Sequence, residues 1–381
     1  MRNGGRIMGK MFKWLLGGIV LLGLVGFAAT FLRTELAIRA VAQAPAGDRL
    51  SINWSAGRDS LQPVIDVFTE VSGIDVEVTE AHDIYNTDVI LISDVGTLLH
   101  AKRGGFLSYM RTPARDAVVP PRYRDRDGMW YAVALRARAV VYNRETVDPD
   151  TLTSWADLAD PKWQGRLCLD TSGTVQNRSM VAMMLRHWGE RRTNAWLEGV
   201  MANLKDGAGH DFRADPANMT RVATGECDLT FLDTHHIGHA AAGHAGPEQR
   251  AASDLIGVTW VSQDFATPMN VVGVGLNPGT RFRVQAELLV DFFLSPRGQA
   301  LLSEHLNTYP LRPDVALSEW LVSYGSVPVH EVDLNDLESL YTQAITVMEA
   351  AGWPRGDTDH QARARAQERQ RKAPINPVLY P

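Results

Sequence analysis

The stretch that decides the fold runs from Trp155 to Leu185 and reads WADLADPKWQGRLCLDTSGTVQNRSMVAMML. Residues 157–163 predict a short helical turn stopped by a proline, and residues 165–169 have the apolar run of a buried strand. Residues 170–177 form a polar loop, and an apolar helix is expected from Ser179 through Trp188. A strand, an open loop and a helix N-terminus in this order are typical of small-ligand sites in α/β sheets.

Length and charge narrow the class of protein. Of the 381 residues, about 330 lie between the two termini, which suits two lobes of the usual domain size. The formal net charge of -6 is small for this length and argues against a general nucleic-acid binder. We therefore expect a monomeric, globular, two-lobed chain that does not bind nucleic acid.

The two cysteines, Cys168 and Cys227, match no CxxC or zinc-finger spacing. Both fall in strands expected in the second lobe, so they could pair in an oxidising compartment. We expect two separately buried thiols instead.

The N-terminal segment indicates export. Four basic residues precede an apolar run over residues 14–32, which has about the length needed to cross a bilayer. We expect residues 1–47 to form a signal or membrane anchor with a linker. An uncleaved anchor is favoured over a cleaved signal, because the small-x-small cleavage sites lie well past the apolar run. The body would then lie in the periplasm.

The body divides into four predicted segments. Residues 48–142 are expected to form the first lobe, residues 143–269 the second, and residues 270–353 a return to the first lobe with the C-terminal helices. Two β-like runs, Trp130–Tyr142 and Asn270–Leu276, are expected to cross between the lobes. Residues 354–381 form a basic tail with few apolar residues that predicts disorder.

Five separated stretches carry a resemblance to a known family. They are the opening stretch at 155–185, TDVILISDVGTLLHAKRGGFL at 87–107, LRARAVVYN at 135–143, VATGECDLTFLDTHHIG at 222–238 and AITVMEAAGW at 344–353. They resemble, in order, stretches of the periplasmic ferric-iron-binding proteins of ABC importers. The resemblance covers nearly everything from about Leu50 to Trp353.

The resemblance implies the fold and the partners. It implies an α/β, two-lobe periplasmic-binding-protein fold of type II, in which each lobe has a central, mostly parallel sheet flanked by helices. Two crossing strands would form the hinge. The lobes would close on a small inorganic or chelated solute, and an ABC permease with its ATPase would recognise the closed form.

The resemblance also implies the metal ligands, and here the chain departs from the family. The family holds Fe(III) with tyrosine oxygens, and Tyr142 keeps the tyrosine of the crossing strand. The family's adjacent tyrosine pair is replaced by His235 and His236. Imidazole suits borderline metals better than Fe(III). We expect these three residues to bind iron, as Fe(III) or an iron chelate, or another transition metal, with Asp233 and His239 supporting them.

An anion is expected to accompany or replace the metal. The family's N-terminal His-Tyr aligns on Gly57 and Arg58, and a guanidinium there suggests a bound carbonate, citrate, phosphate or carboxylate. Arg138 and the loop residues Ser172 and Thr174 are the other candidate anion ligands. The alternative cargo is a metal-free organic or phosphorylated anion, taken up or sensed.

Enzymatic functions are disfavoured. The chain has no GxSxG, HExxH or Walker sequence. A metal-dependent hydrolase built on His235, His236 and Asp233 would need a carboxylate base that we do not identify. An extracytoplasmic sensor is a further alternative, but the chain shows no signalling domain. We therefore expect a transport protein that is not an enzyme.

Overall fold

The computed structural model describes residues 49–54, 57–80, 85–207, 212 and 214–355. The predicted N-terminal anchor and the predicted disordered tail after residue 355 lie outside these ranges. Among the helices that are described, none has both the length and the apolar character needed to cross a bilayer.

Seven strands form one sheet in the order β2-β1-β3-β7-β4-β5, and β6 also pairs with β4. Strands β1, β2 and β3 are parallel, whereas β7 runs antiparallel to β3 and β4. Strands β5 and β6 both run antiparallel to β4. The described strands are β1 Leu50–Asn53, β2 Val76–Thr79, β3 Val89–Ile92, β4 Trp130–Asn143, β5 Leu229–Asp233, β6 Ile256–Thr259 and β7 Met269–Leu276.

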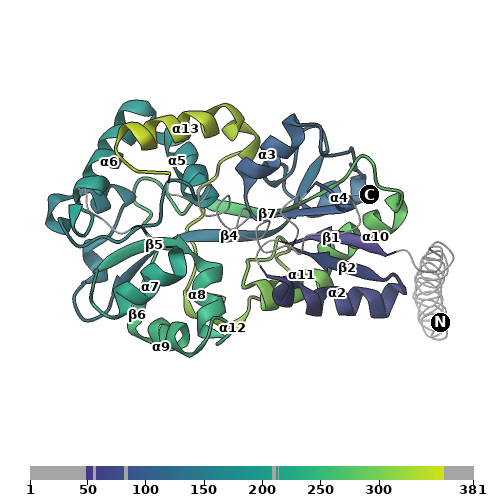
Figure 1. Ribbon diagram of the computed structural model, residues 1–381, viewed down its shortest axis with the longest axis horizontal. Helices are drawn as coiled ribbons and strands as arrows, with labels where there is room; N and C mark the ends of the chain where they lie inside the picture. The colour runs from purple at the N-terminus through teal and green to yellow at the C-terminus, as the bar shows by residue number, and fades with distance from the viewer. Residues whose placement is uncertain (1–48, 55–56, 81–84, 208–211, 213, 356–381) are drawn as a thin grey trace, which may run out of the picture.

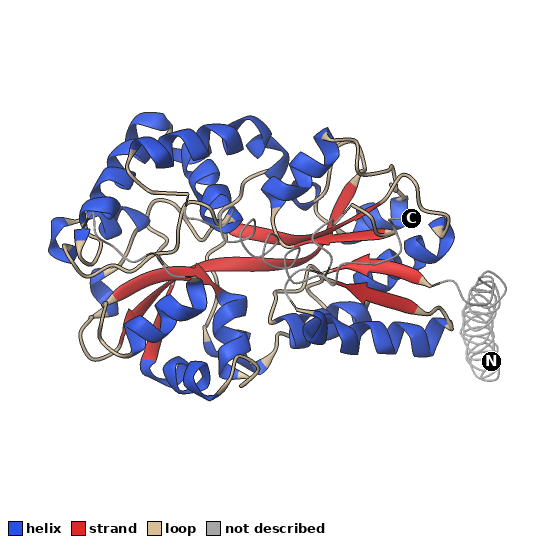
Figure 2. Cartoon of the chain, viewed as in Figure 1, coloured by secondary structure: helices blue, strands red, loops and turns tan. Residues whose placement is uncertain are grey.

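Helices cover both faces of this sheet (Figure 2). The described α-helices are α2 Arg58–Ser72, α3 Val95–Arg103, α4 Pro113–Val118, α5 Val175–Trp188, α6 Glu190–Ala202, α7 Asp215–Ala223, α8 Thr234–Ala241, α9 Pro247–Leu255, α10 Arg283–Leu294, α11 Pro296–Leu306, α12 Glu319–Ser323 and α13 Glu338–Ala350. Short 3₁₀ helices lie at Pro121–Tyr123, Pro149–Thr151, Trp155–Ala159, Pro161–Trp163 and Leu334–Leu337.

Strand β4 joins two lobes (Figure 1). Its residues 130–137 pair with β7, and its residues 138–143 pair with β5 and β6. The first lobe contains β1, β2, β3 and β7 with α2, α3, α10 and α11, and the second contains β5 and β6 with α5 to α9. All residues of β4 except Tyr142 are buried, because both of its faces are covered. The predicted two-lobe fold with two crossing strands is confirmed.

The elements follow from their sequences. Helix α2 buries Leu61, Val64, Ile65 and Phe68 at helical spacing and ends at Gly73, which adopts a left-handed φ of 73°. All four residues of β3 are buried, as expected for a central parallel strand. Helix α5 of the second lobe packs against α6 and α13 (Figure 1).

Two predictions in the opening stretch are wrong. Residues 165–169 form no strand, and only Leu167 makes isolated bridges, to Leu204 and Leu229. Helix α5 begins at Val175, about one turn before the predicted Ser179, and the buried Asn177 of this first turn accepts a hydrogen bond from Arg138 and donates one to the Thr171 carbonyl.

The expectation of two free thiols is also wrong, since Cys168 and Cys227 form a disulfide with a Cα–Cα distance of 5.9 Å. The Cys168 amide donates to the Leu229 carbonyl at 3.0 Å. The segment after Leu167 therefore runs beside the start of β5, which brings two cysteines 59 residues apart into bonding range.

Candidate functional site

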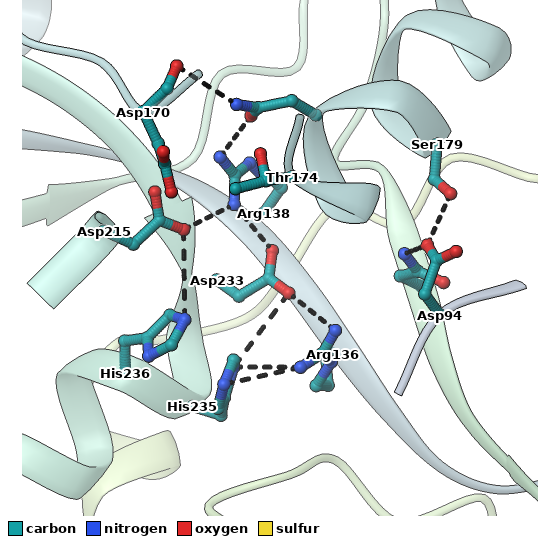
Figure 3. A network of polar contacts seen from close by, with 12 residues as sticks. Asp94, Arg136, Arg138, Asp170, Thr174, Ser179, Asp215, Asp233, His235 and His236 are labelled. Atoms are coloured by element: carbon teal, nitrogen blue, oxygen red, sulfur yellow. Dashed lines mark hydrogen bonds and ion pairs between the residues drawn. The ribbon is translucent and has the colours of Figure 1, made fainter. Parts of the chain in front are cut away.

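The histidine pair lies where β5 ends and α8 begins. Asp233 is the last residue of β5 and the N-cap of α8, and His235 and His236 follow in the first turn. The centroids of the two imidazole rings are 3.8 Å apart. Their side chains are 17% and 28% exposed, respectively. The strand end therefore presents both rings at the edge of the sheet (Figure 3).

Arg136 links this pair to the first lobe. One of its guanidinium nitrogens lies 3.4–3.5 Å from the ring nitrogens of His235. Another lies 3.1 Å from the Asp233 carboxylate and donates to the carbonyl of Ser93, just before α3. Arg136 is 2% exposed. It therefore positions the His235 ring against the crossing strand.

The guanidinium of Arg138 is already paired with side chains of the second lobe. Its guanidinium lies 2.8 Å from Asp215 and 3.1 Å from Asp233, and it donates to the side-chain oxygen of Asn177 at 2.5 Å. Because it faces two carboxylates and is only 3% exposed, the structure does not present it as an open anion site.

Ser172 and Thr174 lie behind this network, away from the histidine rings. The Thr174 hydroxyl donates to the Thr171 carbonyl at 3.0 Å, and the Ser172 amide donates to the carbonyl of Pro354 at 2.9 Å. The Trp353 indole donates to the Asp170 carbonyl at 2.8 Å. The end of the described chain thus covers this loop, and neither Ser172 nor Thr174 lines the two cavities described below.

Tyr142 is not brought to the histidines. It pairs with Leu229, whereas Arg138, four residues earlier on β4, pairs with Asp233. Four residues of strand correspond to about 13 Å. Its ring lies over Gly257 of β6, where an added Cβ would approach it to 2.1 Å. The structure therefore gives Tyr142 a packing role at the far end of the second lobe.

The cleft between the lobes contains two cavities. The smaller one, of about 160 Å³, is lined by Trp54, Ser60, Arg136, His235, His236, His239, Val272, His305, Leu306 and Thr308. The larger one, of about 960 Å³, is lined by Gly57, Arg58, Asp59, Ser60, Pro63, Val78, Glu80, His239, His244 and His305. Both cavities lie between α8 of the second lobe and α2 and α11 of the first lobe.

Arg58 lies at the mouth of the cleft. It is exposed, its Nε donates to Gln62 at 3.2 Å, and its amide donates to Glu80 at 2.5 Å. Asp59 and Glu80 line the same cavity. The predicted anion-binding guanidinium thus sits among carboxylates that oppose an anionic solute.

Burial sets the protonation of the site. Loss of solvent lowers the pKa of His235 well below its usual value, and the neighbouring His236 adds to this. Burial also lowers the pKa of His236, although Asp215 and Asp233 oppose the shift. Both rings are consequently neutral at pH 7, the form in which imidazole binds metals.

The charged side chains behind the His235 and His236 rings carry a net negative charge. Three carboxylates, Asp170, Asp215 and Asp233, face the two guanidiniums of Arg136 and Arg138. Burial and Asp215 raise the pKa of Asp170 to about 6, so most of it is ionised at neutral pH. The site therefore favours a cation over an anion.

Sequence reasoning missed His305, Trp54 and Thr308. They come from α11, the residue after β1 and the segment after α11, and no local motif marks them. Only His305 carries a chemical signal, as a metal-ligating residue type. In the described ranges, no three His, Cys, Asp or Glu side chains already converge as a metal site.

Comparisons with known proteins agree with this architecture. The family model for bacterial extracellular solute-binding proteins matches residues 34–329. Iron uptake protein A1 of Synechocystis is 32% identical over 268 residues, which cover 70% of this chain and 73% of that protein. Among solved structures, a Bordetella ferric binding protein is 26% identical and has a TM-score of 0.72, with 80% of this chain and 99% of that chain covered.

A Trichodesmium protein solved in complex with iron and citrate ligands has a TM-score of 0.74 and 24% identity, covering 80% of this chain and all of that one. At this identity the match shows the fold. The resemblance to ferric-iron-binding proteins that the sequence suggested is confirmed by these relatives. The chain belongs to the family of bacterial extracellular solute-binding proteins.

Proposed function

We propose that this chain is the solute-binding subunit of an ABC importer and that it carries iron, as Fe(III) or a small iron chelate. The observation that carries the proposal is the pair of neutral imidazoles of His235 and His236 at the wall of an interlobe pocket. Relatives named for iron uptake and ferric binding support iron as the cargo.

The size and charge of the pocket support a metal over an organic anion. The smaller cavity, of about 160 Å³, is below the roughly 300–1,000 Å³ typical of organic-ligand sites, whereas the adjoining cavity of about 960 Å³ lies within that range. Arg138 already faces Asp215 and Asp233, and Arg58 lies beside Glu80. The Arg138 guanidinium therefore lacks the uncompensated positive charge that a phosphorylated solute would need, and Arg58 shares its cavity with the carboxylates of Asp59 and Glu80.

Imidazole nitrogen in place of phenolate oxygen changes the expected preference among metals. Neutral nitrogen donors bind Fe(II), Zn(II), Cu(II) and Ni(II) well, whereas Fe(III) prefers anionic oxygen. A small anion such as citrate or carbonate would supply oxygen ligands and let the histidine pair retain ferric iron. Another transition metal is the second candidate cargo, and the histidine pair is the observation that favours it.

Hinge closure is the mechanism that we propose for uptake. The lobes would rotate about β4 and β7, expel water from the cleft and enclose the metal. A permease would then recognise the closed form. We assign residues 48–142 and 270–306 to the first lobe, and residues 143–269 together with α13 to the second, because α13 packs against α5. The chain would act as a monomer without catalysis in the periplasm, with the apolar run at 14–32 as an anchor.

The test is the double variant His235→Ala/His236→Ala, titrated with Fe(III)-citrate, Fe(II), Zn(II) and Cu(II) by calorimetry. We expect the affinity for the cargo metal to fall by about 100-fold or more, because both nitrogen donors are lost. The melting temperature should stay close to that of the unmodified chain, because both side chains are partly exposed.

His100→Ala is the matched control, since His100 is an exposed histidine on α3 and its removal should leave the affinity unchanged. An unaltered affinity in the double variant would refute the site. Binding of citrate without metal, at the same affinity as the complex, would instead identify the cargo as an organic anion.

A further inference from the structure

A second histidine pair lies at the C-terminal end of α8. The His244 amide donates to the His239 carbonyl at 3.1 Å, and the Gly243 amide donates to the Ala240 carbonyl at 2.8 Å. Gly243 has a φ of 81°. These two hydrogen bonds and the left-handed glycine define a Schellman motif, in which the side chains at the two outer positions come together.

These outer positions normally carry apolar residues in contact, but here both are histidines. The centroids of the His239 and His244 rings are 5.2 Å apart, with 63° between the ring planes. Zinc-bound imidazole nitrogens lie about 2.0–2.1 Å from the metal, and tetrahedral angles then place the centroids of two such rings about 5 Å apart. The backbone motif thus holds the two rings at the separation of a bidentate metal clamp.

The surroundings add a third nitrogen donor and negative charge. His305, in the last turn of α11, lines the same 960 Å³ cavity from the opposite lobe. Asp59 and Glu80 also line it, against the single guanidinium of Arg58. His305 and His239 also line the smaller pocket. His244 belongs only to the larger cavity, and His235 and His236 belong only to the smaller one.

We propose that His239, His244 and His305 form a separate binding site for a divalent late transition-metal ion, of the class of Zn(II), Cu(II) and Ni(II), at the mouth of the cleft. His239 and His244 hold the ion from the second lobe, and His305 completes the ligand set from the first lobe. Since no three such groups converge yet among the described residues, a rotation of His305 or a movement of the lobes brings in the third ligand. The site does not depend on which metal occupies the deeper pocket.

The test uses Co(II) as a spectroscopic substitute for Zn(II), added to the full chain without a histidine tag. Tetrahedral Co(II) absorbs visible light far more strongly than octahedral Co(II). We expect intense bands that saturate with Co(II) and disappear when Zn(II) is added. His244→Ala and His305→Ala should each weaken Co(II) binding by at least 10-fold. His244 is exposed, so its replacement leaves folding intact.

A backbone variant tests the geometry without removing a donor. Gly243→Ala places a Cβ on a residue with a φ of 81° and should also weaken Co(II) binding, because the Schellman motif no longer holds His244 against His239. His100→Ala and the double variant His235→Ala/His236→Ala should keep the bands, which separates this site from the deeper pocket.

Three results would overturn the proposal. The first is the same Co(II) spectrum and affinity in His244→Ala or His305→Ala as in the unmodified chain. The second is loss of the bands in His235→Ala/His236→Ala alone, which would place the ion in the deeper pocket. The third is a weak octahedral spectrum that no variant changes, which would indicate nonspecific surface binding.

Discussion

At the scale of single residues, the structure changes which side chains remain open to a solute. His235 and His236 line the pocket as neutral rings. Arg138, which the sequence marked as an anion ligand, is enclosed by carboxylates. Asp170 lies behind Arg138, and its burial and the neighbouring carboxylate of Asp215 raise its pKa to about 6. The free energy of unfolding should therefore depend on whether the Asp170 carboxyl is ionised.

The variant Asp170→Asn should raise the free energy of unfolding at pH 7.5 by about 2 kcal/mol. The pKa of Asp170 is raised to about 6 in the folded chain. The folded state therefore holds this proton more tightly than the unfolded state, and stability falls as pH rises from about 4 to 6. Because asparagine does not titrate, the variant should not lose stability over this pH range. Denaturant titrations at several pH values measure it.

Asp75→Asn is the control for this prediction, because Asp75 is exposed on the first lobe. Its replacement should leave the dependence of stability on pH unchanged. If the free energy of unfolding of Asp170→Asn changes with pH as it does in the unmodified chain, ionisation of Asp170 does not destabilise the folded state.

At the scale of elements, two helices from different lobes touch through a residue without a side chain. A Cβ at Gly238 of α8 would lie 2.8 Å from the side-chain atoms of Asn307, the residue that follows α11. Asn307 is 1% exposed and has a φ of 52°. The absence of a side chain at position 238 therefore permits the close approach of the two helices.

Gly238→Ala should lower the free energy of unfolding by about 1–3 kcal/mol, because the added methyl group overlaps the buried Asn307 side chain. Adding Asn307→Gly should restore most of the loss, since glycine removes the overlap and adopts the left-handed backbone readily. Chemical denaturation of the single and double variants measures both effects. A fully stable Gly238→Ala chain would show that the two helices separate without cost.

The disulfide joins two segments of the second lobe, and its removal should be costly. Cys168→Ala/Cys227→Ala should lower the free energy of unfolding by about 4 kcal/mol, since the bond closes a loop across 59 residues of separation. A reductant should destabilise the unmodified chain and leave the double variant unaffected. If reductant does not shift the melting temperature of the unmodified chain, the two thiols are not paired.

At the scale of the whole molecule, the two lobes are hydrogen-bonded to each other on one side of the crossing strand and face each other across a cleft on the other side. Away from the cleft, Asp94 at the start of α3 accepts hydrogen bonds from Ser179 of α5 at 2.5 Å and from Asn270 of β7 at 2.8 Å (Figure 3). On the cleft side, α8 faces α2 and α11 across the two cavities (Figure 1). This arrangement suits a pivot near Asp94 and closure at the cleft.

Addition of Fe(III)-citrate should reduce the radius of gyration in small-angle X-ray scattering, because the metal draws the lobes together. The double variant His235→Ala/His236→Ala should show no such contraction at the same concentration. A solute that binds tightly without contraction would argue against hinge closure as the transport mechanism.

The sequence by itself determined the two crossing strands, the family and the position of the histidine pair. Apolar runs predicted both crossing strands, because a strand covered on both faces must be apolar along its whole length. The position of His235 and His236 followed from the resemblance to the family, because the motif that contains them lies in one continuous stretch from β5 into α8.

Only the tertiary structure decided which distant residues share the site. Packing of the lobes brought His305 to the cleft, whereas strand register and packing within the second lobe placed Asp215 and Asp233 on Arg138 and Tyr142 beside Gly257 of β6. It also paired Cys168 with Cys227. These contacts join segments tens of residues apart, and their geometry follows from strand register and helix packing, which local sequence periodicity does not encode.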